Sequence, residues 1–191
     1  SGSGDAPGAV ALNVLVAEDD PTLQQLSSLM LERLGHRATI VSNGEEAVTA
    51  VVRNAYDVVL MDMQMPRMDG LEATRRIRTA GAAVAQPHII ALTGGAREQD
   101  REDCRRAGMD GYVTKPAVCF TVLDEWGPAV KSEVVRTFLS SSSADLAAIE
   151  EAIRRGSADD ARAVAHRLRG SSVAVGATLL AEACGRLEHA S

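Results

Sequence analysis

The chain has 191 residues, of which 46% are hydrophobic but only 3% aromatic, so its cores must consist mainly of aliphatic side chains. This length favours one medium-sized domain with a smaller second unit. The formal net charge of −6 argues against direct nucleic-acid binding, which requires a clustered excess of basic side chains.

The N-terminal part of the chain predicts a linker followed by a strand, an acidic turn and a helix. Residues 1–10 begin with a Ser/Gly repeat, and we assign them to a linker or cloning tag. An apolar run at 12–17 predicts a strand, and the turn after it carries Glu18 and Asp19. Leucines at helical spacing up to Leu34 then predict a helix.

Strand and helix patterns continue to alternate after this first pair. Further apolar runs lie at 38–41, 58–61, 89–92 and 112–114, with helical patterns between them at 44–53, 71–78 and 97–107. The runs are continuously apolar, which is typical of a parallel sheet covered by helices on both faces. We therefore predict an α/β fold with a doubly wound parallel five-stranded sheet, which binds ligands at the carboxyl ends of its strands.

The alternation stops after Lys115, and the rest of the chain predicts a small all-α unit. Helical patterns lie at 128–155, 158–169 and 177–189. Four consecutive serines at 140–143 are poor helix formers, so we expect a kink or bend in the first of these helices.

Three acidic residues are expected at one edge of the sheet. Asp62 directly follows the third strand, and Glu18 and Asp19 follow the first. Three converging carboxylates repel one another unless a hard divalent cation lies among them, and Mg²⁺ fits such a site. With that charge offset, one carboxylate can attack phosphorus and form an aspartyl phosphate.

Two further strand ends carry groups that can hold phosphoryl oxygens. Thr93 ends the fourth strand, with the amide of Gly94 behind it, and Lys115 ends the fifth. Gln64 offers a backbone carbonyl as a further metal ligand. An isolated Asp at a strand end is usually a cap, but these groups in this order favour a phosphoryl site.

Four segments of the first unit resemble the motifs of two-component response-regulator receiver domains. They are VLVAEDD at 14–20, LMDMQMPRMDG at 60–70, LTG at 92–94 and GYVTKP at 111–116. The resemblance implies the flavodoxin-like order of the sheet and the transfer of phosphate to Asp62 from a phosphohistidine.

The same resemblance implies a magnesium site and a conformational switch. The implied ligands are Glu18 or Asp19, Asp62 and the backbone carbonyl of Gln64. Thr93 and Tyr112 are implied as the switch pair, because in that family the phosphoryl group draws the hydroxyl inward and the aromatic ring follows. We expect the partner surface on the face that this movement remodels, formed by the last strands and helices.

A histidine on the predicted helix at 158–169 is a second candidate site. The apolar residues share one helix face, and His166 points away from it. Arg162 and Arg169 lie four and three residues from His166, so they are its neighbours on the helix surface and can hold phosphoryl oxygens. An exposed histidine alone is more often merely solvated.

The sequence around His166 resembles the histidine phosphotransfer (HPt) domain, which is normally a helical bundle. The segments are AHRLRGSS at 165–172, GA at 176–177 and LAEACGRLE at 180–188. The resemblance implies that His166 becomes the phosphohistidine. It also implies that Arg169 is the basic residue three positions on, where Lys is usual.

We therefore predict a receiver domain at 11–126 and an HPt segment at 127–191, which act in a phosphorelay. The expected source is the C-terminal part of a hybrid sensor histidine kinase, without its ATP-binding domain. Only 118–126 remains for the fifth receiver helix that this family normally has. The implied partners are a cognate histidine kinase or phosphohistidine domain and a downstream response regulator.

Other sequence features predict a cytoplasmic protein. The sequence contains no run of about 18 apolar residues and no basic-then-apolar leader, so we expect neither a membrane span nor a secretion signal. A location on the cytoplasmic side of a membrane-anchored sensor kinase is compatible with this. Three widely spaced cysteines without a CxxC pair suggest neither disulfides nor zinc.

Two alternative functions are open at this point. A pseudo-receiver would bind partners without being phosphorylated, although the complete set of acidic, Thr and Lys residues argues against it. A phosphohydrolase of the haloacid dehalogenase type also forms an aspartyl phosphate, but it needs a second Asp two positions after the nucleophile. That position is Gln64 here.

Overall fold

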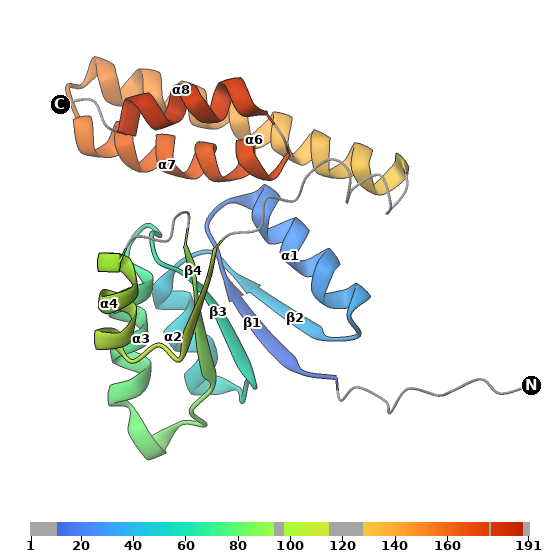
Figure 1. Ribbon diagram of the computed structural model, residues 1–191, viewed down its shortest axis with the longest axis vertical. Coiled ribbons are helices and arrows are strands. Elements are labelled where there is room, and N and C mark those ends of the chain that lie inside the picture. Colours follow the sequence, from blue (N-terminus) through green and yellow to red (C-terminus); the bar gives the residue numbers. More distant parts are fainter. Residues whose placement is uncertain (1–10, 94–97, 115–127, 176, 189–191) are drawn as a thin grey trace, which may run out of the picture. The chain divides into compact units, whose positions relative to one another are not determined.

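The computed structural model describes residues 11–93, 98–114, 128–175 and 177–188. The chain divides into two compact units. The first holds most of the sheet with α2, α3 and α4, and the second holds α6, α7 and α8 (Figure 1). Gly94, Lys115 and the segment 118–126 lie outside the described residues.

The sheet has five strands in the order β2-β1-β3-β4-β5 (Figure 1). They are β1 Asn13–Ala17, β2 Arg37–Val41, β3 Val58–Asp62, β4 His88–Thr93 and β5 Gly111–Thr114. β1 pairs in parallel with β2 and β3, and β3 pairs in parallel with β4. The strand order reverses at β1 and β3, which confirms the predicted flavodoxin-like α/β fold.

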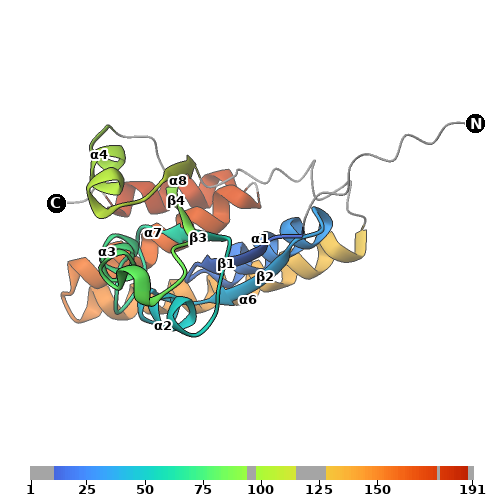
Figure 2. The same cartoon turned by 90° about the horizontal axis from the view of Figure 1, so that it is seen from below.

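The helices that alternate with the strands are α1 Pro21–Arg33, α2 Gly44–Arg53, α3 Gly70–Thr79 and α4 Glu98–Ala107, with a short 3₁₀ helix at Gly81–Ala83. α3 lies between α2 and α4 and contacts both (Figure 2). These three helices cover one face of the sheet with a core of aliphatic and sulfur-containing side chains. That core includes Leu15, Val59, Met61, Ile77 and Ile89.

A reciprocal cap fixes the start of α2. The Asn43 side chain accepts a hydrogen bond from the Glu46 amide at 3.0 Å, and its own amide donates to the Glu46 carboxylate at 2.8 Å. The Ser42 amide also donates to this carboxylate and lowers the pKa of Glu46. This cap satisfies amides that the first helical turn leaves unpaired.

The described residues from 128 to 188 form three helices, α6 Pro128–Arg154, α7 Ala158–Ala174 and α8 Thr178–Glu188. α7 packs against both α6 and α8. Ala161, Ala165 and Leu168 are buried, which confirms most of the predicted apolar face of α7. An ion pair of 2.5 Å between Arg167 and Asp145 joins α7 to α6.

α6 runs through the four serines at 140–143 without a break, so they do not interrupt the helix. The kink or bend expected there stays a prediction. Ser143 donates its hydroxyl proton to the Leu139 carbonyl at 2.9 Å, and Ser141 donates to the Phe138 carbonyl at 3.2 Å. Such hydroxyl bonds are compatible with a continuous helix, although they often bend it. The buried Ser142 hydroxyl has no hydrogen-bond partner among the described residues, so the packing of α6 against α7 must outweigh the weak helix propensity of the serines.

α7 is longer than its sequence pattern predicts, since it continues past Gly170 to Ala174. Ser172 donates its hydroxyl proton to the Leu168 carbonyl at 2.6 Å, and both Ser171 and Ser172 are fully buried. Among the described residues, no helix is long and apolar enough to cross a membrane.

Candidate functional site

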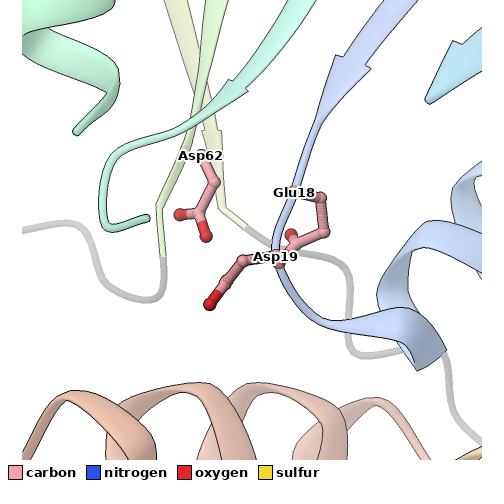
Figure 3. A group of neighbouring side chains, drawn as sticks. All are labelled: Glu18, Asp19 and Asp62. Carbon is pink, nitrogen blue, oxygen red and sulfur yellow. The ribbon is translucent and has the colours of Figure 1, made fainter. Parts of the chain in front are cut away.

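Three carboxylates converge at the carboxyl ends of β1 and β3. Ala17 of β1 is paired with Met61 of β3, so Glu18 and Asp62 take the next positions along these adjacent strands. Figure 3 shows both side chains together with Asp19, and their ligand atoms all lie within 4.8 Å of one another. Only 1% of Glu18 and 2% of Asp62 are exposed. The acidic cluster that the sequence predicts is therefore present in the fold.

The turn after β1 holds Glu18 by hydrogen bonds from neighbouring residues. The Asp20 amide donates to Glu18 Oε1 at 3.2 Å, and the Gln24 side-chain amide donates to the Glu18 carbonyl at 2.6 Å. Asp20 itself accepts hydrogen bonds from the amides of Thr22 and Leu23, at 2.8 and 2.9 Å.

Asp20 is therefore the cap of α1 rather than a member of the acidic cluster. Sequence reasoning gave it no role, although its place before Pro21 at the first helical position was a usable signal. The cap orients the first turn of α1 and so helps to position the two acidic residues before it.

Asp62 is the last residue of β3, and the loop after it folds closely around its backbone. The Gln64 amide donates to Asp62 Oδ1 at 3.3 Å, and the Gly70 amide donates to the Met63 carbonyl at 3.1 Å. A Cβ atom at Gly70 would lie 2.1 Å from the Asp62 carbonyl oxygen, which only glycine avoids. Sequence reasoning missed this role of Gly70. The assignment of the Gln64 carbonyl as a metal ligand stays a prediction.

Thr93 lies at the end of β4, next to the strand that carries Asp62. Asp62 is paired with Leu92, and Thr93 is the following residue, with 6% of its surface exposed. Tyr112 of β5 is 41% exposed, and the Arg101 guanidinium of α4 lies 4.7 Å from the centre of its ring. This cation–π contact stabilises the exposed position of the ring. The other two predicted phosphoryl contacts, Gly94 and Lys115, lie outside the described residues.

His166 is partly buried on α7 and contacts the end of α8. Its Nδ1 atom lies 3.4 Å from Glu188 Oε2, and Arg169 Nη1 lies 3.0 Å from the same oxygen. Arg162 instead forms an ion pair of 2.9 Å with Asp159 on its own helix. Sequence reasoning missed Glu188, which lies 22 residues from His166 in the chain.

Comparison with known families identifies the unit that carries the acidic cluster. The family model described as the response regulator receiver domain matches residues 14–121. The chain belongs to the receiver-domain family. A second family model, described as the Hpt domain, matches residues 133–191. The order of the two matches, with the receiver model before the Hpt model, is the arrangement of hybrid histidine kinases and supports a role in phosphorelay signal transduction.

Individual relatives support the same conclusion. Histidine kinase 1 of Arabidopsis thaliana is 36% identical over 140 residues, a match that covers 55% of this chain. Sensor protein GacS of Pseudomonas syringae is 42% identical over 108 residues, covering 56% of this chain. The match spans only 12% of each of these two relatives.

One similar solved structure is the receiver domain of a sensor histidine kinase from Pseudomonas aeruginosa, crystallised with magnesium in its active-site cleft. Its sequence is 43% identical to this chain, and the TM-score is 0.51. The similarity covers 56% of this chain and 87% of that one. Another similar structure is a complex of Ypd1, a histidine phosphotransfer protein of Saccharomyces cerevisiae, with the receiver domain of Ssk1. The matching chain is 28% identical to this one, with a TM-score of 0.51, and the similarity covers 56% of this chain and 79% of that one.

Proposed function

We propose that the receiver passes a phosphoryl group between Asp62 and a phosphohistidine, with His166 of the HPt segment as the second relay site. The observation that carries this proposal is the cluster of Glu18, Asp19 and Asp62 at adjacent strand ends of a receiver fold. A buried carboxylate at the end of β3 is placed to act as the nucleophile.

The donor set of this cluster fits a hard divalent cation, and we propose that the cation is Mg²⁺. Three carboxylates with ligand atoms within 4.8 Å of one another, two of them buried, need such a charge to offset their repulsion. Glu18, Asp19 and Asp62 would hold the ion, with the Gln64 carbonyl as a further ligand. When bound, it would neutralise charge on the phosphoryl oxygens.

In this proposal, groups of the protein chain perform the phosphoryl transfer. An Asp62 carboxylate oxygen attacks phosphorus, the bond from phosphorus to the donor imidazole breaks, and its electron pair returns to that nitrogen. The Thr93 hydroxyl, the Gly94 amide and the Lys115 ammonium contact the phosphoryl oxygens. Tyr112 moves from its exposed position after Thr93 engages the phosphoryl group.

In the HPt segment, His166 carries the phosphoryl group and Arg169 contacts its oxygens. His166 Nδ1 faces Glu188, which supports Nε2 as the nitrogen that accepts phosphorus. Arg169 is one turn away on the same helix, within reach of a phosphoryl group on that nitrogen.

We assign the receiver to 11–126 and the HPt segment to 127–191, after a linker or tag at 1–10. The two family matches, at 14–121 and 133–191, support this division. The proposed partners are a cognate histidine kinase or phosphohistidine domain and a downstream response regulator. We infer that the chain functions in the cytoplasm as part of a hybrid sensor histidine kinase.

A labelling experiment tests both relay sites. The full chain is incubated with Mg²⁺ and radiolabelled acetyl phosphate, an acyl phosphate that we expect to label Asp62 but not to label His166 directly. The label is then separated by its lability in acid and in base. We expect Asp62→Asn to lose all label, and His166→Gln to lose only the acid-labile phosphohistidine. His88→Gln, which changes an exposed histidine at the start of β4, serves as the control and should match wild type. A wild-type chain without label would favour the pseudo-receiver.

A further inference from the structure

One carboxylate of α8 contacts both groups that the proposed function assigns to the HPt site. Glu188 Oε2 lies 3.4 Å from His166 Nδ1 and 3.0 Å from Arg169 Nη1. The Glu188 side chain is only 13% exposed. Its second oxygen, Oε1, is buried and has no hydrogen-bond partner among the described residues. In the part of the chain that the structure describes, the polar contacts of the Glu188 carboxylate are therefore those with His166 and Arg169.

Phosphorylation of His166 changes the charges around this carboxylate. A phosphoryl group adds about two negative charges at neutral pH, a few ångströms from Glu188. It also competes with Glu188 for the Arg169 guanidinium, which in the unphosphorylated chain is already paired. Both effects make phosphohistidine less stable than it would be beside a neutral side chain, because like charges repel strongly at partly buried sites.

We propose that Glu188 is a positioning residue that sets the phosphoryl-transfer potential of His166. It holds Arg169 and the Nδ1 side of the imidazole before transfer, and it destabilises the phosphohistidine afterwards. This inference rests on the proposed role of His166. The result is a phosphoryl group that leaves His166 more readily for an aspartate acceptor.

The reaction moves one phosphoryl group between His166 and an acceptor aspartate. In the forward direction, the acceptor carboxylate attacks phosphorus, the bond between phosphorus and His166 Nε2 breaks, and its electron pair remains on that nitrogen. The position of this equilibrium is the quantity that Glu188 controls.

The test uses two full-length variants as donor and acceptor. The Asp62→Asn chain, which keeps only the histidine site, is labelled with phosphoramidate and freed of the reagent. It is then mixed with the His166→Gln chain and Mg²⁺ until the distribution of label is constant. The measured quantity is the ratio of acid-labile phosphohistidine to base-labile aspartyl phosphate.

Adding Glu188→Gln to the donor should raise this ratio about fivefold, because glutamine keeps the size and an acceptor oxygen but removes the charge. The increase should shrink at higher salt, which a purely structural role would not produce. Glu182→Gln, on an exposed position of the same helix, should leave the ratio unchanged. An unchanged or lower ratio with Glu188→Gln would overturn the proposal. Failure of every donor to take label would instead contradict the role of His166.

Discussion

At the scale of single residues, the receiver site depends on a glycine at position 70, where a side chain would not fit. A Cβ atom there would meet the Asp62 carbonyl at 2.1 Å and the Met61 side chain at 2.9 Å. Both neighbours belong to β3, so the strain would act directly on the strand end that carries the acceptor carboxylate.

Gly70→Ala should therefore lower both stability and phosphorylation. We expect a loss of about 1–3 kcal/mol in the free energy of unfolding, as for other overpacked sites. Gly111→Ala is the matched control, because a Cβ atom at Gly111 meets nothing within 4 Å. Urea unfolding and Asp62 labelling of both variants measure these effects. Equal stability of the two variants would contradict the predicted clash.

At the scale of elements, the cap of α2 stabilises the fold through hydrogen bonds to the backbone rather than through packing in the core. Replacing Asn43 with Ala leaves the Glu46 amide without its acceptor, since that amide lies in the first helical turn. We expect Asn43→Ala to cost about 1 kcal/mol of stability. Glu45→Gln, at an exposed position of the same turn, should change it by less than about 0.5 kcal/mol. Equilibrium unfolding in denaturant at neutral pH compares the two.

The helices also show where local sequence signals fail. The serines of α6 are poor helix formers, yet the helix is continuous because its packing against α7 outweighs their weak propensity. The five strands were predictable because short apolar runs that alternate with helical patterns are typical of a parallel sheet covered by helices. Asp62 was predictable because it directly follows such a run. Glu188 was not, since its contact with His166 depends on how α8 packs against α7.

At the scale of the whole molecule, ligand binding at the acidic cluster should be visible as added stability. A cation that binds only the folded receiver stabilises it by about 2.7 kcal/mol at a concentration one hundred times its Kd. We therefore expect Mg²⁺ to raise the Tm of the wild-type chain, and to raise that of Asp19→Asn much less. Thermal unfolding followed by circular dichroism measures both shifts. Glu98→Gln, on an exposed position of α4, is the control, and an equal shift in all three chains would contradict a site at Asp19.

The pairing of Ala17 with Met61 ties the acidic cluster to the alignment of two adjacent strands. If β1 slipped by one residue against β3, every side chain of β1 would turn to the opposite face of the sheet. Glu18 would then leave its position beside Asp62, and either Ala17 or Asp19 would take that position. The geometry of the acidic cluster therefore depends on the register of β1 against β3.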